Sequence, residues 1–170
     1  SGIIESLDVE STVFENCALS LTTNHANRTC IQNVRLTNCT AHGCEVGPAR
    51  LTDVVIDTLT TSGLLVIWGA LFQRVAIRGR IGRIRINHWI HPTVRATEVQ
   101  GPFDAERAIW YGNVDCALDI SAARFGEFEM RGVPSSLVVR DPTSQVVVTR
   151  ERVERNHLRL RPEAIGPHWA

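Results

Sequence analysis

Two histidines flank a tryptophan near the middle of the chain, at His88, Trp89 and His91. Imidazole titrates near neutral pH, so it can move protons, and it is also a common metal ligand. Two histidines alone do not make a metal site, and no carboxylate lies near them in sequence. This stretch is therefore where we would expect an enzymatic site if the protein has one, and we expect no metal.

A run of arginines precedes these histidines in the stretch QRVAIRGRIGRIRINHW. The run comprises Arg74, Arg78, Arg80, Arg83 and Arg85. Such a basic ridge could grip phosphate, nucleic acid or an acidic partner, with Trp89 available for stacking. The whole chain has a formal net charge of zero, however, whereas nucleic-acid-binding proteins usually have a strongly basic balance. The charge balance therefore favours a protein partner over nucleic acid.

Motifs of known catalytic machinery are absent from the sequence. There is no GxSxG nucleophile elbow, no HExxH zinc motif and no glycine-rich phosphate loop. No CxxC pair occurs either, which argues against a zinc site. The sequence therefore predicts a protein that is not an enzyme and needs no cofactor.

A five-residue repeat underlies the centre of the chain. Residues 29–63 divide without a slip into TCIQN, VRLTN, CTAHG, CEVGP, ARLTD, VVIDT and LTTSG. The first residue of each block is small or aliphatic, and the third is mostly a larger apolar residue. Neither a helical period of 3.6 nor a strand period of 2 fits seven such blocks. A strict short period of this kind is typical of a repeat architecture.

The repeat has a direct physical interpretation. The first and third residues point inward from a short extended run, and the other residues turn a corner. Four such faces close one coil of about 20 residues, and coils stack at the strand spacing of ~4.8 Å. The sequence therefore predicts an all-β protein built from stacked coils.

The pattern resembles the pentapeptide-repeat family, whose middle residue is usually Leu or Phe and whose residue two positions earlier is often Ala or Cys. Cys39, Cys44 and Ala49, with Val46 and Leu51, fit this pattern, whereas the usual Asp or Asn between them is missing. The resemblance implies a right-handed quadrilateral β-helix (β-solenoid) and a divergent member. Some members of that family imitate duplex DNA and bind DNA gyrase.

The same frame extends along most of the chain. It covers residues 7–21, resumes at 65–79 and can be followed again over 103–132, with breaks between these stretches. We expect about seven coils within residues 1–148. Residues 149–170 have no period and are charged, so we expect them to form a C-terminal cap or a contact that makes a homodimer.

Stacked coils place residues about 20 positions apart on neighbouring levels. Asp53 then lies under Arg74 and Asp57 under Arg78, while Asp104 would lie under Arg124 and Arg107 under Glu127. Such opposite charges form cross-strand pairs on the outer faces. The pairing leaves three arginines without partners, so the sequence predicts a partner-binding site at Arg80, Arg83, Arg85 and Trp89.

A second polar group lies at Asp115, Cys116 and Asp119. The repeat frame places Asp115 in an inward slot, where burial would raise the pKa of its carboxyl group. Together with His88 and His91, Asp115 and Asp119 are candidates for a polar site.

The five cysteines indicate a reducing compartment. Cys17, Cys39 and Cys44 occupy inward slots as small apolar residues, while Cys30 and Cys116 face outward. A secreted disulfide scaffold would be denser in cysteine. No run approaches the length of a transmembrane span. We therefore expect a cytoplasmic protein that does not contact a membrane.

Together these observations predict a non-catalytic interaction or scaffold protein that presents a β-helix surface to a macromolecular partner. Two alternatives remain open. One is a DNA gyrase-binding protection protein that acts as a DNA mimic. The other is an enzyme or biosynthetic accessory protein with a site near His88 and His91.

Overall fold

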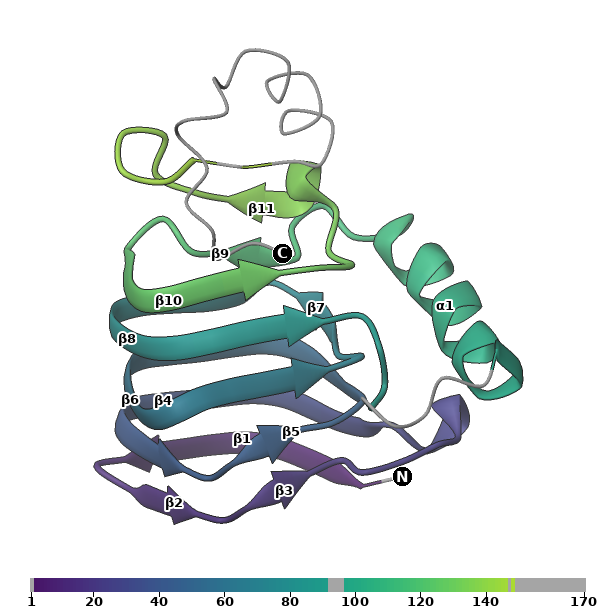
Figure 1. Cartoon of the computed structure of the whole chain (residues 1–170), viewed down its shortest axis with the longest axis horizontal. Coiled ribbons are helices and arrows are strands. Elements are labelled where there is room, and N and C mark those ends of the chain that lie inside the picture. Colours follow the sequence, from purple (N-terminus) through teal and green to yellow (C-terminus); the bar gives the residue numbers. More distant parts are fainter. Residues whose placement is uncertain (1, 92–96, 147, 149–170) are drawn as a thin grey trace, which may run out of the picture.

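The protein belongs to the all-β class. The computed structural model describes residues 2–91, 97–146 and 148. Strands make up 55% of the structure, and they form one 11-stranded sheet whose pairs are all parallel (Figure 1). The residues expected to form a C-terminal cap or dimer contact, 149–170, lie outside the described residues.

The strands follow one another in six stacked levels within the described part of the chain. The levels are β1 (Ile3–Glu10), β2 (Val13–Glu15) and β3 (Ala18–Leu19); β4 (Thr29–His42) and β5 (Glu45–Val46); β6 (Ala49–Trp68); β7 (Leu71–Gln73) and β8 (Val75–Asn87); β9 (Leu118–Asp119) and β10 (Ala123–Met130); and β11 (Val138–Val139). The helices are α1 (Thr97–Tyr111) and the short 3-10 turns η1 (His25–Asn27) and η2 (Ser135–Leu137).

In the middle of the stack, successive levels pair through backbone hydrogen bonds at a near-constant step along the chain. Cys30 of β4 lies opposite Arg50 of β6, and Arg50 lies opposite Leu71 of β7. These are steps of 20 and 21 residues along the chain. The chain therefore returns to the same place after four blocks of five, as the repeat predicts.

Most blocks end in a residue with positive φ, which turns a corner in the backbone. Residues with positive φ include Asn33 (55°), Asn38 (52°), Asp53 (56°) and Thr58 (62°), each five residues from a neighbouring block end. Asn and Asp tolerate this left-handed conformation better than most residues because their short polar side chains bond locally. Most of the positive-φ corners carry Asn, Asp, Ser or Thr, and others carry glycine, such as Gly43 and Gly79.

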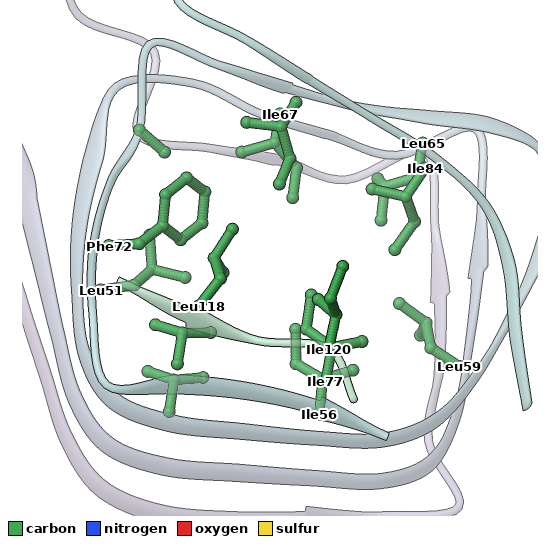
Figure 2. Close-up of a cluster of buried hydrophobic side chains, with 14 of the residues drawn as sticks. Leu51, Ile56, Leu59, Leu65, Ile67, Phe72, Ile77, Ile84, Leu118 and Ile120 are labelled. Atoms are coloured by element: carbon green, nitrogen blue, oxygen red, sulfur yellow. The ribbon is translucent and has the colours of Figure 1, made fainter. Parts of the chain in front are cut away.

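The core lies between the faces of the coils. Figure 2 shows inward side chains from successive levels, among them Leu51, Ile56 and Ile84, gathered inside the ribbon. Leu51 and Ile56 are 7% and 9% exposed, as the repeat predicts for third-position residues. Cys39 is buried as expected, whereas Cys17 is exposed. Cys17 lies on the first level, whose interior has no neighbouring level on one side within the described chain.

Residues 97–111 form a helix, and the prediction that the coil frame resumes at Phe103 was wrong. The stretch DAERAIWY is rich in residues that favour helices. The helix packs beside the stack (Figure 1), burying Phe103 to 2% exposure, and the indole of Trp110 donates a hydrogen bond to the Phe72 carbonyl. The coil ladder resumes only at Leu118, which pairs with Val75 of β8. The expected seven coils are therefore six levels in the described residues.

No helix in the described part of the chain is long and apolar enough to cross a membrane.

Candidate binding site

Ion pairs run along the outer surface between successive levels, and we call them the ion ladder. Arg74 contacts Asp53 at 2.6 Å and Arg78 contacts Asp57 at 2.9 Å, both between β6 and the following level. The Arg74–Asp53 contact uses two parallel N–H donors on the two carboxylate oxygens. The hydrogen bonds from Arg74 hold the pKa of Asp53 below its ordinary value. Both pairs confirm the predicted spacing of 21 residues.

The other two predicted ion pairs were wrong because α1 interrupts the coils. Asp104 and Arg107 are one turn apart on α1 and contact each other at 2.7 Å. Glu127 of β10 instead contacts Arg83 of β8 at 2.6 Å, across a step of 44 residues.

The remaining basic residues of β8 divide into two groups. Arg83 is paired with Glu127, and Arg85 contacts Glu129 at 2.6 Å. The expectation that these two arginines lack acidic partners was therefore wrong. Arg80 differs, because no acidic side chain pairs with it among the described residues.

Arg80 faces a second arginine. In the parallel ladder between β8 and β10, Arg80 lies directly opposite Arg124. Both side chains are exposed, and neither has an ion-pair or hydrogen-bond partner in the described chain. Neighbouring strands are about 4.8 Å apart, and like charges opposite each other destabilise a sheet. These two positions are thus an exception to the ion ladder.

A shallow depression lies beside these arginines, and we call it the arginine hollow. Its volume is about 340 Å³. It is lined by Leu59, Thr60, Thr61, Arg80, Ile81, Gly82, Arg124, Phe125 and Gly126.

The arginine hollow arises from a change of register. Leu59 of β6 pairs with Ile81, but the next pair is Leu64 with Arg83, so β6 carries extra residues at this point. The levels above have glycine here, and a Cβ on Gly82 would lie only 2.3 Å from the Thr61 hydroxyl. Glycine at position 82 accommodates the Thr61 side chain of the bulge, and the missing side chain of Gly126 leaves space open on the level above.

The chemistry of the arginine hollow suits a small oxyanion. Two guanidinium groups present planar N–H donors that match carboxylate or phosphate oxygens. Thr60 is exposed and its hydroxyl has no partner among the described residues. The Thr61 hydroxyl accepts the backbone N–H of Arg83, which fixes the bulge. No His, Cys, Asp or Glu is among the described residues that line the hollow.

The corner at His88, Trp89 and His91 is held by packing and by α1. The rings of His88 and Trp89 lie 4.8 Å apart, and the His91 ring lies 6.3 Å from that of Trp68. Burial lowers the pKa of His88, and the nearby Arg107 adds to the effect. The buried Gln100 side chain accepts the Ile90 N–H and donates to the His88 carbonyl. These contacts describe a structural junction between β8 and α1.

The second predicted polar group does not form a site with this corner. Asp115 is exposed, so the expectation that it faces inward was wrong. It precedes β9 in the connection that follows α1, where the repeat frame does not hold. Asp119 accepts hydrogen bonds from the Ser121 N–H and hydroxyl. No described contact joins His88 to Asp115 or Asp119.

Sequence reasoning missed a charged cluster under α1. Glu106 of α1 contacts Arg28 at 2.7 Å, and its other oxygen accepts a 3.0 Å bond from Arg50 Nε. The Arg28 side chain is only 1% exposed, and its guanidinium lies 4.7 Å from the centre of the Phe103 ring. Burial alone would raise the pKa of Glu106, but bonds from Arg50 and Arg28 outweigh burial and lower it. When residues 103–107 are assigned to a coil, no pattern in the sequence indicates that Glu106 contacts Arg28.

A second, larger hollow lies at the end of the stack. Its volume is about 460 Å³, and Phe125, Phe128, Met130 and Val138 contribute apolar atoms to it. The rings of Phe125 and Phe128 stack at 4.3 Å. Val146 and Val148, close to the end of the described chain, also line this hollow.

Within residues 2–91, 97–146 and 148, no three His, Cys, Asp or Glu side chains are grouped so that they could hold a metal ion. Comparisons with protein-family models, with curated proteins and with solved structures found no match for this chain.

Proposed function

We propose that the protein is a non-catalytic binding protein that presents one face of its stacked coils to another protein. We also propose that its fold is a divergent right-handed quadrilateral β-helix of the pentapeptide-repeat kind. The step of five and the left-handed residue at block ends support this fold. All five cysteines are free, which supports a reducing compartment such as the cytoplasm.

The observation that carries the proposal is the Arg80–Arg124 couple, which has no acidic partner among the described residues. Arg74, Arg78, Arg83 and Arg85 each contact an acidic side chain of a neighbouring level. Two like charges that lie opposite each other lower the stability of the free protein. Binding of an acidic group from a partner would offset that cost.

The two alternatives receive less support. A DNA mimic needs a continuous negative surface, but Asp53, Asp57 and Glu127 are neutralised by arginines. An enzyme at His88 and His91 needs a positioned acid or base partner. The acidic residue near His88 is Asp104, and its carboxylate is held by Gln100 and Arg107. Supercoiling inhibition by a quinolone that stays unchanged in the presence of the protein would exclude the gyrase alternative.

Site-specific photo-crosslinking in the cells that naturally produce the protein tests the proposal. A crosslinker at Thr40, which lies one level below Thr60, should capture a defined protein. The same crosslinker at Thr37, which pairs with Asp57 beside the ion ladder, serves as the positional control and should capture less.

Charge variants supply the second control. Replacing Arg80 and Arg124 with Ser should abolish capture at Thr40, whereas Arg78→Ser with Arg74→Ser removes the same charge and should leave it intact. Equal capture from both crosslinker positions, or no capture at all, would contradict a binding function for this face.

A further inference from the structure

We infer that the arginine hollow binds the carboxylate of an aspartate or glutamate side chain carried on an extended segment of a protein partner. This inference rests on the proposed binding function and names the chemistry that the partner must bring. It uses three features of the described structure: the facing arginines, the shape of the hollow and the acidic residues beside it.

The two facing arginines leave a position where a negative charge would fit. Arg80 and Arg124 lie opposite each other in register and are both exposed. At the neighbouring positions Arg83 and Arg85, the residues directly opposite are Glu127 and Glu129, and each arginine contacts its partner. A carboxylate held between Arg80 and Arg124 would give this position the same alternation of charge. Guanidinium groups bind carboxylates through parallel N–H donors.

The shape of the hollow admits one side chain from outside. Gly82 and Gly126 face each other without side chains, and Thr60 offers an unpaired hydroxyl as a further donor. A Cβ on Gly126 would lie 3.5 Å from the Gly82 carbonyl oxygen, an ordinary contact. Larger side chains at position 126 can therefore fill the hollow without breaking the strand, which gives a steric test independent of charge.

The surroundings favour a carboxylate over a phosphate chain. Glu127 directly follows Gly126, and Glu129 lies two residues further along β10. Both glutamates are already paired with Arg83 and Arg85, so this part of the described chain offers a run of phosphates no further arginine that lacks an acidic partner, whereas a single carboxylate needs only the two facing arginines. Nucleic-acid binding also needs many basic contacts, and the chain as a whole has no net charge.

Arginine side-chain NMR tests the inference on the full chain. A short oligoglutamate peptide is titrated while the Nε–Hε resonances of Arg80, Arg124 and Arg78 are followed, with an oligoglutamine peptide of equal length as the neutral control. The glutamate peptide should shift Arg80 and Arg124 saturably and leave Arg78, which is held by Asp57, largely unchanged.

Three variants distinguish binding at the arginine hollow from a general effect of net charge. Arg124→Gln and Gly126→Leu should each weaken peptide binding about tenfold or more, equivalent to one charge-assisted contact. Arg78→Gln changes net charge by the same amount as Arg124→Gln and should have little effect. Circular dichroism and the core resonances report whether each variant keeps the fold.

Each of the other outcomes overturns the inference. Equal weakening by Arg78→Gln would mean that the peptide senses only net charge. Stronger shifts with inorganic phosphate or duplex DNA than with peptide would assign the hollow to phosphate. An absence of shifts at millimolar peptide would mean that the hollow is not an anion site. In that last case, crosslinking from Thr40 would still test whether this face binds a protein. A failure of the carboxylate inference can therefore be distinguished from a failure of the proposed binding function.

Discussion

At the scale of single residues, the residue on the neighbouring level determines whether an arginine has an acidic partner. Arg74 and Arg78 contact aspartates one level away, and Arg83 contacts Glu127. All three are neutralised by a neighbour that is distant in sequence. Arg124 occupies an equivalent outward position but faces Arg80.

A charge reversal at Arg124 should therefore stabilise the free protein. Arg124→Glu would extend the ion ladder by one pair and remove a like-charge contact, which should raise the free energy of unfolding by about 0.2–1 kcal/mol. The measurement is urea denaturation at low salt. The matched reversal Arg78→Glu, which places two acids together at Asp57, should lower stability instead. A loss of stability in Arg124→Glu would show that this arginine is needed structurally.

At the scale of elements, α1 is attached to the stack by one carboxylate and two arginines. Glu106 reaches Arg28, which is almost fully buried, and Arg50, which is partly exposed. A buried charge that loses its partner is costly. The docking of α1 should therefore depend on the ionisation of Glu106.

Acid should weaken the docking of α1. The pKa of Glu106 is lower in the folded protein than in an unfolded chain. Its contribution is therefore present above the unfolded value, about 4.3, and is lost as the pH falls through the lower folded value. The Trp110 indole, bonded to the Phe72 carbonyl, reports docking by NMR.

The Glu106→Gln variant is the control for this prediction. Its Trp110 signal should already show weakened docking at neutral pH and should change little over the acid range. A Glu106→Gln signal that matches the native protein at neutral pH would exclude the carboxylate as the attachment point.

At the scale of the whole molecule, stability should be greatest in the middle levels. Phe72 of β7 lies on a middle level, where its strand pairs with β6 and its carbonyl accepts a bond from Trp110 of α1, and it is 1% exposed. Phe14 of β2 is on the first level and is only partly buried. In a repeat stack each unit is stabilised mainly by its neighbours. Identical substitutions should therefore have unequal effects along the stack.

Phe72→Ala should lower the free energy of unfolding by about 3–5 kcal/mol, the usual loss for a buried aromatic side chain. Phe14→Ala should cost clearly less because part of that side chain is already in contact with water. Chemical denaturation of the two variants in parallel gives the comparison. Equal losses would indicate that the first level is covered as completely as the middle.

The sequence predicted the stacked coils but not the interruption. Period five marks inward residues such as Leu51 and Ile56 because each block has the same environment, and it predicts Arg74 above Asp53 by counting. The segment 103–111 also fits the block pattern, yet its helix-favouring residues and the packing of Phe103 decide its structure. The Arg124–Arg80 register follows from that helix, because its length sets which residues lie opposite each other. A count of 20 therefore failed across the helix, although it holds again after it, where Leu118 pairs with Val138.

The departure of the chain between β8 and β9 has a practical consequence. The polypeptide leaves the stack after Asn87 and rejoins it at Leu118, opposite Val75, and the ladder continues in parallel. The turn that ends this excursion includes the exposed Gly112 and Asn113, and exposed loop tips accept added sequence most readily. The molecule should therefore serve as a carrier that displays a grafted epitope or small domain at Asn113 beside the coils.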